Sequence, residues 1–345
     1  MPDPPRGNPT DEQEPPTRGK PQGRYSSRRR LIRRRLLFVI PTLFGMSLIV
    51  FMLGRLSLTS PNILALGFFA PEEAKAAFNE RYHLNEPLVT QYWLWLKDAA
   101  QGEFGDSYIT KTPVFDSVRR GVVVTAQLTI GALVLAVALG GAVGIMGGLT
   151  RLRLISRAIS SATVLALSIP QFWLGLVFIL LLGVNAGWLP AGSYVAFSED
   201  PAGWFKHLLL PWVTLAVGPA GLIARVTQVR VVEEAALPHV LTAKSLGISR
   251  RRIVPRYIVR NALVEPTTVI GVQAGYMLGG AFLVEFVFNL PGLGQIALTA
   301  ARQGDYPIVQ AAAIYATVAF LLISLIVDVI HTLLDVRAEG READV

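Results

Sequence analysis

Residues 121–150 read GVVVTAQLTIGALVLAVALGGAVGIMGGLT, thirty consecutive positions without an Asp, Glu, Lys or Arg. A helix rises about 1.5 Å per residue, so about 20 apolar residues cross a hydrocarbon layer about 30 Å thick. This stretch is long enough to span a membrane. Over the whole chain of 345 residues, 52% are apolar and 16% are charged, against roughly 25% charged in a soluble domain. The composition therefore predicts an all-α integral membrane protein.

Five further stretches without charged residues flank this one, at residues 36–54, 158–198, 207–224, 266–284 and 306–327. Four of them have the length of a single span. The stretch 158–198 is long enough for two, but its second half contains Gly187, Pro190 and Gly192 and lacks a continuous apolar run. We therefore expect one span near residues 159–182 followed by a loop, and six transmembrane helices in total.

Lysine and arginine gather in alternate connections between these spans. They stand at residues 28–35, before the first span, at 151–157, between the second and third, and at 225–260, between the fourth and fifth. Residues 56–118, in contrast, hold four basic and eight acidic residues. Because cationic flanks stay in the cytoplasm, the pattern predicts a multi-pass protein of the plasma membrane with both termini cytoplasmic.

The net charge of +8 follows from the same pattern. Residues 1–35 hold ten basic and four acidic residues, and residues 225–260 hold eight and two, so each segment carries a surplus of six. Together these two patches exceed the whole net charge. The basic balance is therefore explained by orientation in the membrane, and no nucleic-acid partner is predicted.

The same features divide the chain into segments. We expect a disordered basic cytoplasmic tail at residues 1–30, a first transmembrane helix at 31–56, an external loop at 57–120, five further spans within 121–337 and a cytoplasmic tail at 338–345. Residues 72–82 and the aromatic-rich residues 92–96 predict amphipathic helices in the external loop. Such helices lie at the membrane interface, and a docking surface for an external partner is the alternative.

Several chemistries are excluded by missing residue types and spacings. The chain has no cysteine, which excludes disulfides, thiolate zinc sites, iron–sulfur clusters and cysteine nucleophiles. Its four histidines show no His-Glu-x-x-His spacing, and no Gly-x-x-x-x-Gly-Lys-Ser/Thr string occurs, so neither a zinc peptidase nor a phosphate-binding P-loop is predicted. We expect a protein that is not an enzyme and holds no cofactor or metal.

The most informative segment lies in the loop at residues 225–265. Pro238 suits the first turn of a helix, and Gly247 can adopt the left-handed conformation that ends one. Ser249 can cap a second short helix. A helix of about two turns is marginal in water, so the first one needs support from the lipid surface, from its own bundle or from another protein.

The residues of this short helix, Leu241-Thr242-Ala243-Lys244-Ser245-Leu246-Gly247, resemble the "EAA" coupling motif of permease subunits of ATP-driven (ABC) importers. The variant is that of the dipeptide/oligopeptide/nickel permeases. Further motifs of that family occur in the same order, among them Arg260-Asn261-Ala262-Leu263, Gly279-Gly280-Ala281, Glu285, Pro291-Gly292-Leu293-Gly294 and Asp305-Tyr306-Pro307. The resemblance covers residues 30–337.

The chain departs from the family pattern at three places. Leu58-Thr59-Ser60-Pro61 stands where a Gly-Asp-Pro is usual, Glu265 stands where a proline is common, and Leu241 replaces the leading acidic residue of the motif. The first departure concerns the external side of the pathway. The other two are tolerable in a coupling loop.

The resemblance implies a fold, partners and a mechanism. It implies a type I permease core of five spans preceded by one extra span, a second homologous permease subunit, two cytoplasmic ATPase subunits that bind ATP and Mg, and an external solute-binding protein, all at a prokaryotic inner membrane. It also implies that residues 241–247 transmit ATPase motion. We expect Leu241, Ala243, Leu246 and Gly247 to contact the ATPase.

The solute that the resemblance favours is a di- or oligopeptide. Nickel chelates and glutathione are alternatives within the family. Outside the family, the alternatives are a secondary transporter or channel that works without an ATPase, and a membrane scaffold or exporter component.

Polar residues within or beside the spans are candidates for the translocation pathway, because a polar group facing lipid is costly. They are Gln127, Gln171, Gln273, Glu285, Asn289 and Asp328, and by resemblance Pro291, Gly292 and Gly294 stand at an external gate. The alternatives are interhelical hydrogen bonds for the glutamines, structural pairing for the two acids, and a simple turn at residues 291–294.

Overall fold

The computed structural model describes residues 24–55 and 60–342, with side chains described from Val39 to Val327 within those ranges and at Val329. The described segments consist of helices joined by loops, with one isolated bridge between Asp106 and Pro113. The chain divides into two compact units between Pro41 and Thr42.

The long helices match most of the predicted spans. Four described helices are long and apolar enough to cross a membrane: α5 (Val114–Leu149), α8 (Pro201–Ala235), α12 (Val264–Phe288) and the first part of α14 (Tyr306–Glu342). Residues Val39–Arg55, in α1 (Arg24–Arg55), form a shorter apolar helix. The prediction of an all-helical membrane protein is confirmed, with four or five candidate spans besides that shorter helix.

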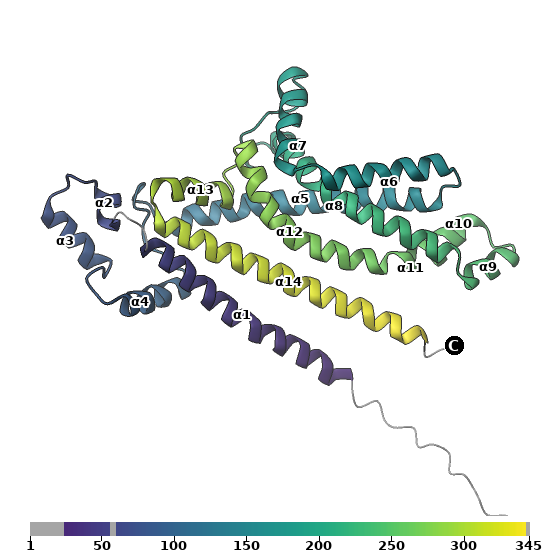
Figure 1. Cartoon of the computed structure of the whole chain (residues 1–345), viewed down its shortest axis with the longest axis horizontal. Coiled ribbons are helices and arrows are strands. Elements are labelled where there is room, and N and C mark those ends of the chain that lie inside the picture. The colour runs from purple at the N-terminus through teal and green to yellow at the C-terminus, as the bar shows by residue number, and fades with distance from the viewer. Residues whose placement is uncertain (1–23, 56–59, 343–345) are drawn as a thin grey trace, which may run out of the picture. The chain divides into compact units, whose positions relative to one another are not determined.

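Residues 159–182, predicted as one span, form two helices instead. Helix α6 (Arg153–Ser168) is followed by α7 (Gln171–Phe178) and a π-helix, η1 (Ile179–Asn185), and the two parts meet at 101°. Figure 1 shows α7 leaving the bundle in which α6 lies. The break follows from Pro170, which has no N–H and forces Ile169 into an extended conformation, φ −81° and ψ 124°.

The closest helix pair in the bundle is α5 and α8, which run side by side in Figure 1. Glycines at every fourth position of α5 face α8. A Cβ added at Gly140 or at Gly144 would lie 2.7 or 2.6 Å from the carbonyl oxygen of Ala220 or Ala224. Small residues at this spacing let helix backbones approach closely, which is how helices associate where lipid is as apolar as the side chains.

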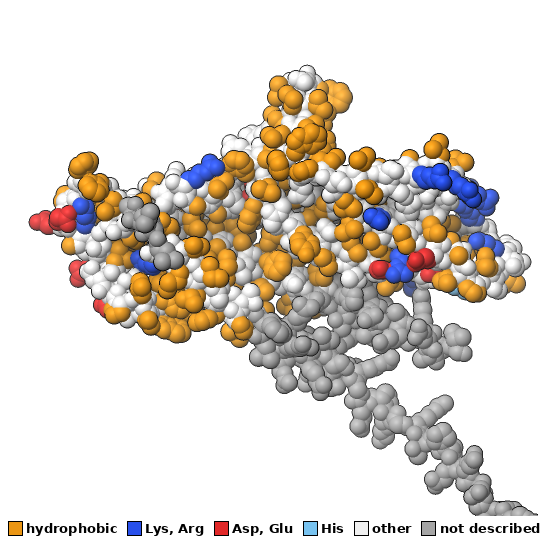
Figure 2. All heavy atoms as spheres, in the orientation of Figure 1, with side chains coloured by type: hydrophobic (Ala, Val, Ile, Leu, Met, Phe, Trp, Pro, Cys, Tyr) orange, Lys and Arg blue, Asp and Glu red, His pale blue; other side chains and the backbone are white. Residues whose placement is uncertain are grey.

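The largest buried cluster forms around this pair. It joins side chains of α5 and α8 with those of α12, among them Leu128, Leu208, Leu215, Ile223, Met277 and Phe288. Hydrophobic side chains also cover the long sides of the molecule, as expected for a surface in contact with lipid, and lysines and arginines gather near the end that carries α9 and α10 (Figure 2).

Between α1 and α5 the described residues form helices α2 (Pro61–Leu66), α3 (Glu72–Arg81) and α4 (Leu88–Ala100). Helices thus occur where the sequence predicted them, and their place on the external side of a membrane interface stays a prediction. The hydroxyls of Tyr92 on α4 and Ser47 on α1 lie 2.8 Å apart. At the other end Asp305 accepts hydrogen bonds from the Ser107 hydroxyl and from the Tyr108 N–H, the latter at 2.9 Å. Burial raises the pKa of Tyr108 to about 12.

A methyl group added at Gly144 should separate α5 from α8, whereas one added at Gly141 should not. The Gly144→Ala variant places its Cβ 2.6 Å from the Ala224 carbonyl oxygen, and Gly141 has no atom within 4 Å of that position. Overpacking of this kind costs about 1–3 kcal/mol, while alanine is otherwise the better helix former. We expect the thermal midpoint of the purified complex to fall for Gly144→Ala and to hold or rise for Gly141→Ala. Equal midpoints would contradict the close-packing argument.

Candidate functional site

The end of the bundle that follows α8 is built from short helices. They are α9 (Pro238–Ser245), α10 (Arg250–Ile253), the π-helix η2 (Val254–Val259) and α11 (Arg260–Ala262). Their inward side chains form a separate buried cluster with Val231 of α8, made of Val240, Ala243, Ile253, Ile258 and Ala262. The predicted short helix is confirmed, and of the three possible supports its own bundle covers one face.

The ends of these short helices follow the local sequence. Gly247 has the predicted left-handed conformation, with φ of +73°. Helix α10 begins directly after Ser249, but the Ser249 side chain makes no capping hydrogen bond. Its predicted role as a cap is therefore wrong, although the boundary is right.

The opposite face of α9 is open. Leu241 is 50% exposed and Leu246 is 75% exposed. The polar members of the predicted motif, Thr242, Lys244 and Ser245, are exposed as well. Ala243 is the exception, because it packs into the chain's own cluster. The helix therefore has one anchored face and one exposed face, on which two leucines stand among polar side chains and contact no other buried cluster of the described residues.

At the other end of the bundle one buried carboxylate joins three helices. Glu285, near the end of α12, is fully buried. Its Oε1 accepts a hydrogen bond from the Thr125 hydroxyl of α5 at 2.5 Å, and its Oε2 accepts from the N–H of Gly294 at 2.8 Å. The Thr125 hydroxyl in turn accepts from the N–H of Leu293 at 2.8 Å.

These bonds satisfy the first N–H groups of α13 (Leu293–Gln303), which have no partner within the helix. A carboxylate is also favoured there by the positive end of the helix dipole. The Glu285 network therefore fixes the start of α13 to α12 and α5.

The turn between α12 and α13 leaves room for the Glu285 carboxylate. Asn289 ends α12 in the left-handed conformation, with φ of 50°. A Cβ at Gly292 would lie 2.1 Å from the carboxyl carbon of Glu285, and one at Gly294 would lie 2.5 Å from the Phe282 ring. Pro291, which precedes Gly292, is exposed. The predicted chain break at residues 291–294 is thus the connection to α13.

The predicted glutamines lie apart from one another. Gln127 on α5 accepts hydrogen bonds from the Tyr194 hydroxyl at 2.9 Å and from the Trp204 indole at 3.0 Å, so it joins α5 to α8 and to the preceding loop. The Gln171 oxygen would lie 2.6 Å from a Cβ at Gly280 of α12. Gln273 is half-buried on α12. No hydrogen bond joins these glutamines among the described side chains, and the Asp328 side chain lies outside them.

A cavity of about 880 Å³ opens beside α13. Of the predicted pathway residues only Asn289 and Pro291 line it. The other polar residues that line it were not predicted as pathway residues, namely Thr110, Ser117, Arg119, Arg120, Ser193, Tyr194, Gln295, Thr299, Gln303 and Asp305. The spacing of Gln295, Thr299 and Gln303 on one face of α13 is the signal that could have found part of this set. The Gln295 side-chain oxygen is buried without a hydrogen-bond partner.

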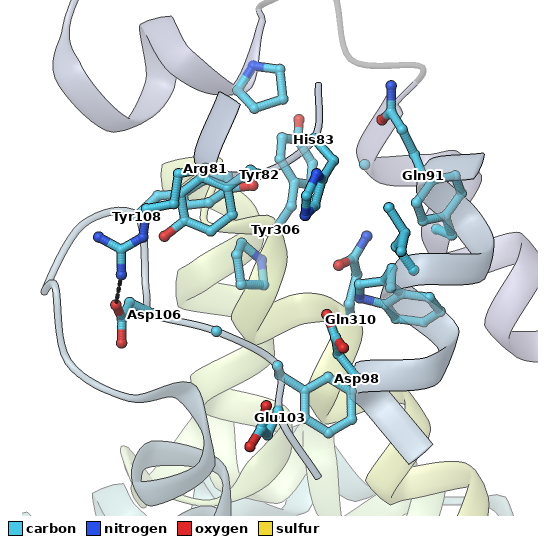
Figure 3. Close-up of a pocket in the computed structure, with 18 of the residues that line it drawn as sticks. Arg81, Tyr82, His83, Gln91, Asp98, Glu103, Asp106, Tyr108, Tyr306 and Gln310 are labelled. Carbon is cyan, nitrogen blue, oxygen red and sulfur yellow. Dashed lines mark hydrogen bonds and ion pairs between the residues drawn. The ribbon is translucent and has the colours of Figure 1, made fainter. Parts of the chain in front are cut away.

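A smaller cavity of about 260 Å³ lies between α4, the loop that follows it and the start of α14. Figure 3 shows Arg81 and Asp106 joined by an ion pair, which measures 2.9 Å, on one side of it, and Asp98 and Glu103 on another. Tyr306 and Gln310 contribute from α14. This cavity borders the contacts that hold α3 and α4 to the bundle.

The chain has clear relatives among known proteins. Residues 124–340 match the family described as the binding-protein-dependent transport system inner membrane component. A Sinorhizobium fredii protein named as a probable peptide ABC transporter permease is 33% identical over 306 residues, which cover 89% of this chain and 98% of that one. The glutathione transport system permease protein of Escherichia coli (strain K12) is 34% identical over 298 residues, 86% and 95% of the two chains.

Among solved structures, the inward-facing MetNI methionine ABC transporter superposes with a TM-score of 0.51 at 20% identity. The match covers 63% of this chain and 95% of that one. At this level of identity it shows a shared fold.

Removing the Thr125 hydroxyl should loosen the start of α13. In the Thr125→Val variant the N–H of Leu293 and one oxygen of Glu285 lose their partner, which costs about 1–3 kcal/mol in a buried site. We expect amide hydrogen exchange at residues 293–295 to become about tenfold faster or more.

The matched control for this change is Thr129→Val, one turn further along α5. Thr129 is also buried, and its hydroxyl has no hydrogen-bond partner. Its exchange should match the wild type. Equal exchange in the two variants would show that the Thr125 hydrogen bonds do not hold α13.

Proposed function

Since this chain belongs to the family of binding-protein-dependent transport system inner membrane components, we propose that it forms half of the translocation pathway of an importer for di- or oligopeptides. It is the permease subunit of an ABC importer and a multi-pass inner-membrane protein. ATP hydrolysis takes place on a separate ATPase subunit, and a binding protein delivers the solute. Transport by this chain without an ATPase is therefore no longer an alternative.

The proposed topology has six spans with both termini in the cytoplasm. It counts residues 36–54 of α1 as the first span and the bent pair of α6 and α7 as the third. The alternation of cationic connections supports it. In this topology residues 57–120 are external, residues 121–337 form the core, and the loop at residues 225–265 faces the cytoplasm.

The observation that carries the proposed mechanism is the two-sided construction of α9. Val240 and Ala243 are buried in the chain's own cluster, while Leu241 and Leu246 are exposed. An anchored helix with two exposed leucines can seat in a groove of a partner and transmit force to α8. We assign residues 241–247 to contact with the ATPase, with Ala243 acting through packing rather than through contact.

The remaining partners complete the pathway. A second homologous permease subunit supplies the other half, and each of the two permeases engages one of two ATPase subunits. The external solute-binding protein delivers its ligand to the side on which α13 and the larger cavity lie. Residues 289–294 and α13 form the gate on this side. Glu285 connects this gate to the bundle, since it fixes the start of α13 to both α12 and α5.

The relatives support a peptide as the solute. One is named for peptide transport and one for glutathione, and glutathione is itself a small peptide that carries carboxylates. Glutathione is therefore the second candidate, and the names of these relatives favour both over nickel chelates. The test is uptake of labelled peptides into proteoliposomes that contain both permeases, both ATPases and the binding protein. Uptake that proceeds without ATP would contradict the proposal.

Replacing the exposed leucines of α9 should uncouple the permease from its ATPase. Burial of a leucine side chain contributes about 1.5–3 kcal/mol, so Leu241→Ser with Leu246→Ser should weaken ATPase binding at least tenfold. Co-purification of the ATPase and binding-protein-stimulated ATP hydrolysis measure the effect.

The control for this pair of changes is Leu154→Ser on α6, because Leu154 is exposed to the same degree but lies outside the loop. It should retain both activities. If the double variant behaves like this control, the exposed face of α9 does not bind the ATPase.

A further inference from the structure

Two arginines stand in the wall of the larger cavity without a counter-ion. Arg119 and Arg120 lie near the start of α5, line this cavity, and are exposed. Neither forms an ion pair among the described residues, and the described polar contact of Arg120 is the Ser117 hydroxyl at 3.5 Å. The wall therefore carries two guanidinium groups that form no ion pair with a described residue, although Asp116 stands three and four residues before them on the same helix.

The one carboxylate that lines the cavity offsets only one of the two charges, so one positive charge is left in excess. Asp305 is 1% exposed, and its two oxygens accept hydrogen bonds from Ser107 and Tyr108 of the loop between α4 and α5. The remaining polar side chains of the wall are uncharged hydroxyls and amides. The cavity is therefore electropositive.

The position of this pair is unusual for a membrane protein. The start of α5 lies at the end of the bundle that carries α13, opposite the end that carries α9 and α10 (Figure 1). In the proposed topology this end is external, whereas arginines beside spans collect on the cytoplasmic side. Anchoring to lipid headgroups would explain an arginine at a helix end, but not its place in the wall of a cavity.

We propose that this cavity binds the carboxylate of the incoming solute through Arg119 and Arg120. A guanidinium binds a carboxylate through two parallel hydrogen bonds, and uncompensated charge in a cleft raises the local concentration of an anionic ligand. Gln295, Thr299 and Gln303, spaced four residues apart on α13, face the same cavity with groups that suit peptide amides.

The solute class that fits this wall is a peptide with a free carboxylate, glutathione included. The inference rests on the proposed function, because it names the chemical group of the solute that the pathway recognises first. The inference adds Arg119 and Arg120 to the proposed function as solute-binding residues at the entrance of the pathway.

The natural absence of cysteine allows a direct measurement of charge in the cavity. A Thr299→Cys variant in the complete importer carries the single thiol of this chain. The rate of its reaction with an anionic sulfonatoethyl methanethiosulfonate is compared with that of a cationic trimethylammonium-ethyl analogue, and the mass of this chain reports the product. We expect Arg119→Gln with Arg120→Gln to lower the anionic-to-cationic rate ratio about tenfold, and the corresponding lysine pair to preserve it.

The matched control is Arg302→Gln on α13, because Arg302 is also exposed but does not line the cavity. Because Arg302 lies three residues from position 299 on the same helix, its loss should lower the rate ratio by less than the loss of the arginine pair does. A ratio that does not respond to the glutamine pair, or responds equally to Arg302→Gln, overturns the inference. Protection of the thiol by phosphatidylglycerol but not by phosphatidylcholine also overturns it, because a lipid headgroup would then be the ligand.

Uptake separates failure of this inference from failure of the proposed function. ATP-dependent uptake of trialanine should fall about tenfold in the glutamine pair and hold in Arg302→Gln. Wild-type uptake of trialanine that the glutamine pair leaves unchanged overturns the inference and supports the function. A rate ratio that falls as expected in an importer that takes up neither trialanine nor glutathione supports the charged cavity and contradicts the peptide function.

Discussion

The close approach of α5 to α8 is the contact on which the rest of the structure depends. Glycines on α5 bring its backbone against the carbonyl oxygens of Ala220 and Ala224, in an environment where apolar burial alone does not draw helices together. Helix α8 leads directly into α9, and the first turns of α5 carry the arginines and Thr125. The pair therefore connects the two functional ends of the chain as one rigid element.

Both ends use the same principle, a short helix held along one side. At the end of the bundle that follows α8, apolar packing around Val240 and Ala243 fixes α9. At the other end hydrogen bonds to the Glu285 carboxylate fix α13. The interaction differs between the two helices for a physical reason. The start of α13 is buried, where an unpaired N–H is costly, whereas α9 exposes its polar groups to water. In each case the free face is the one assigned to a partner or a solute.

Charge is distributed along the chain according to two different rules. In the proposed topology most cations lie in cytoplasmic connections, and residues 1–35 and 225–260 account for the net charge of +8. The arginine pair at the start of α5 lies in a cavity wall. In the proposed topology this pair stands on the external side, so the orientation rule does not explain it.

The sequence by itself determined the membrane class, most of the helices and the boundaries of α9, because hydrophobic length, Pro238 and Gly247 act through contiguous residues. The bend at Pro170 also follows from a local residue, but a count of apolar residues does not show that a helix changes direction. Only the tertiary structure decided that Ala243 faces inward, that Gln127 binds Trp204, and that Glu285 meets Thr125. These partners lie up to 160 residues apart, and their meeting depends on which helix faces pack, a choice that no local pattern specifies.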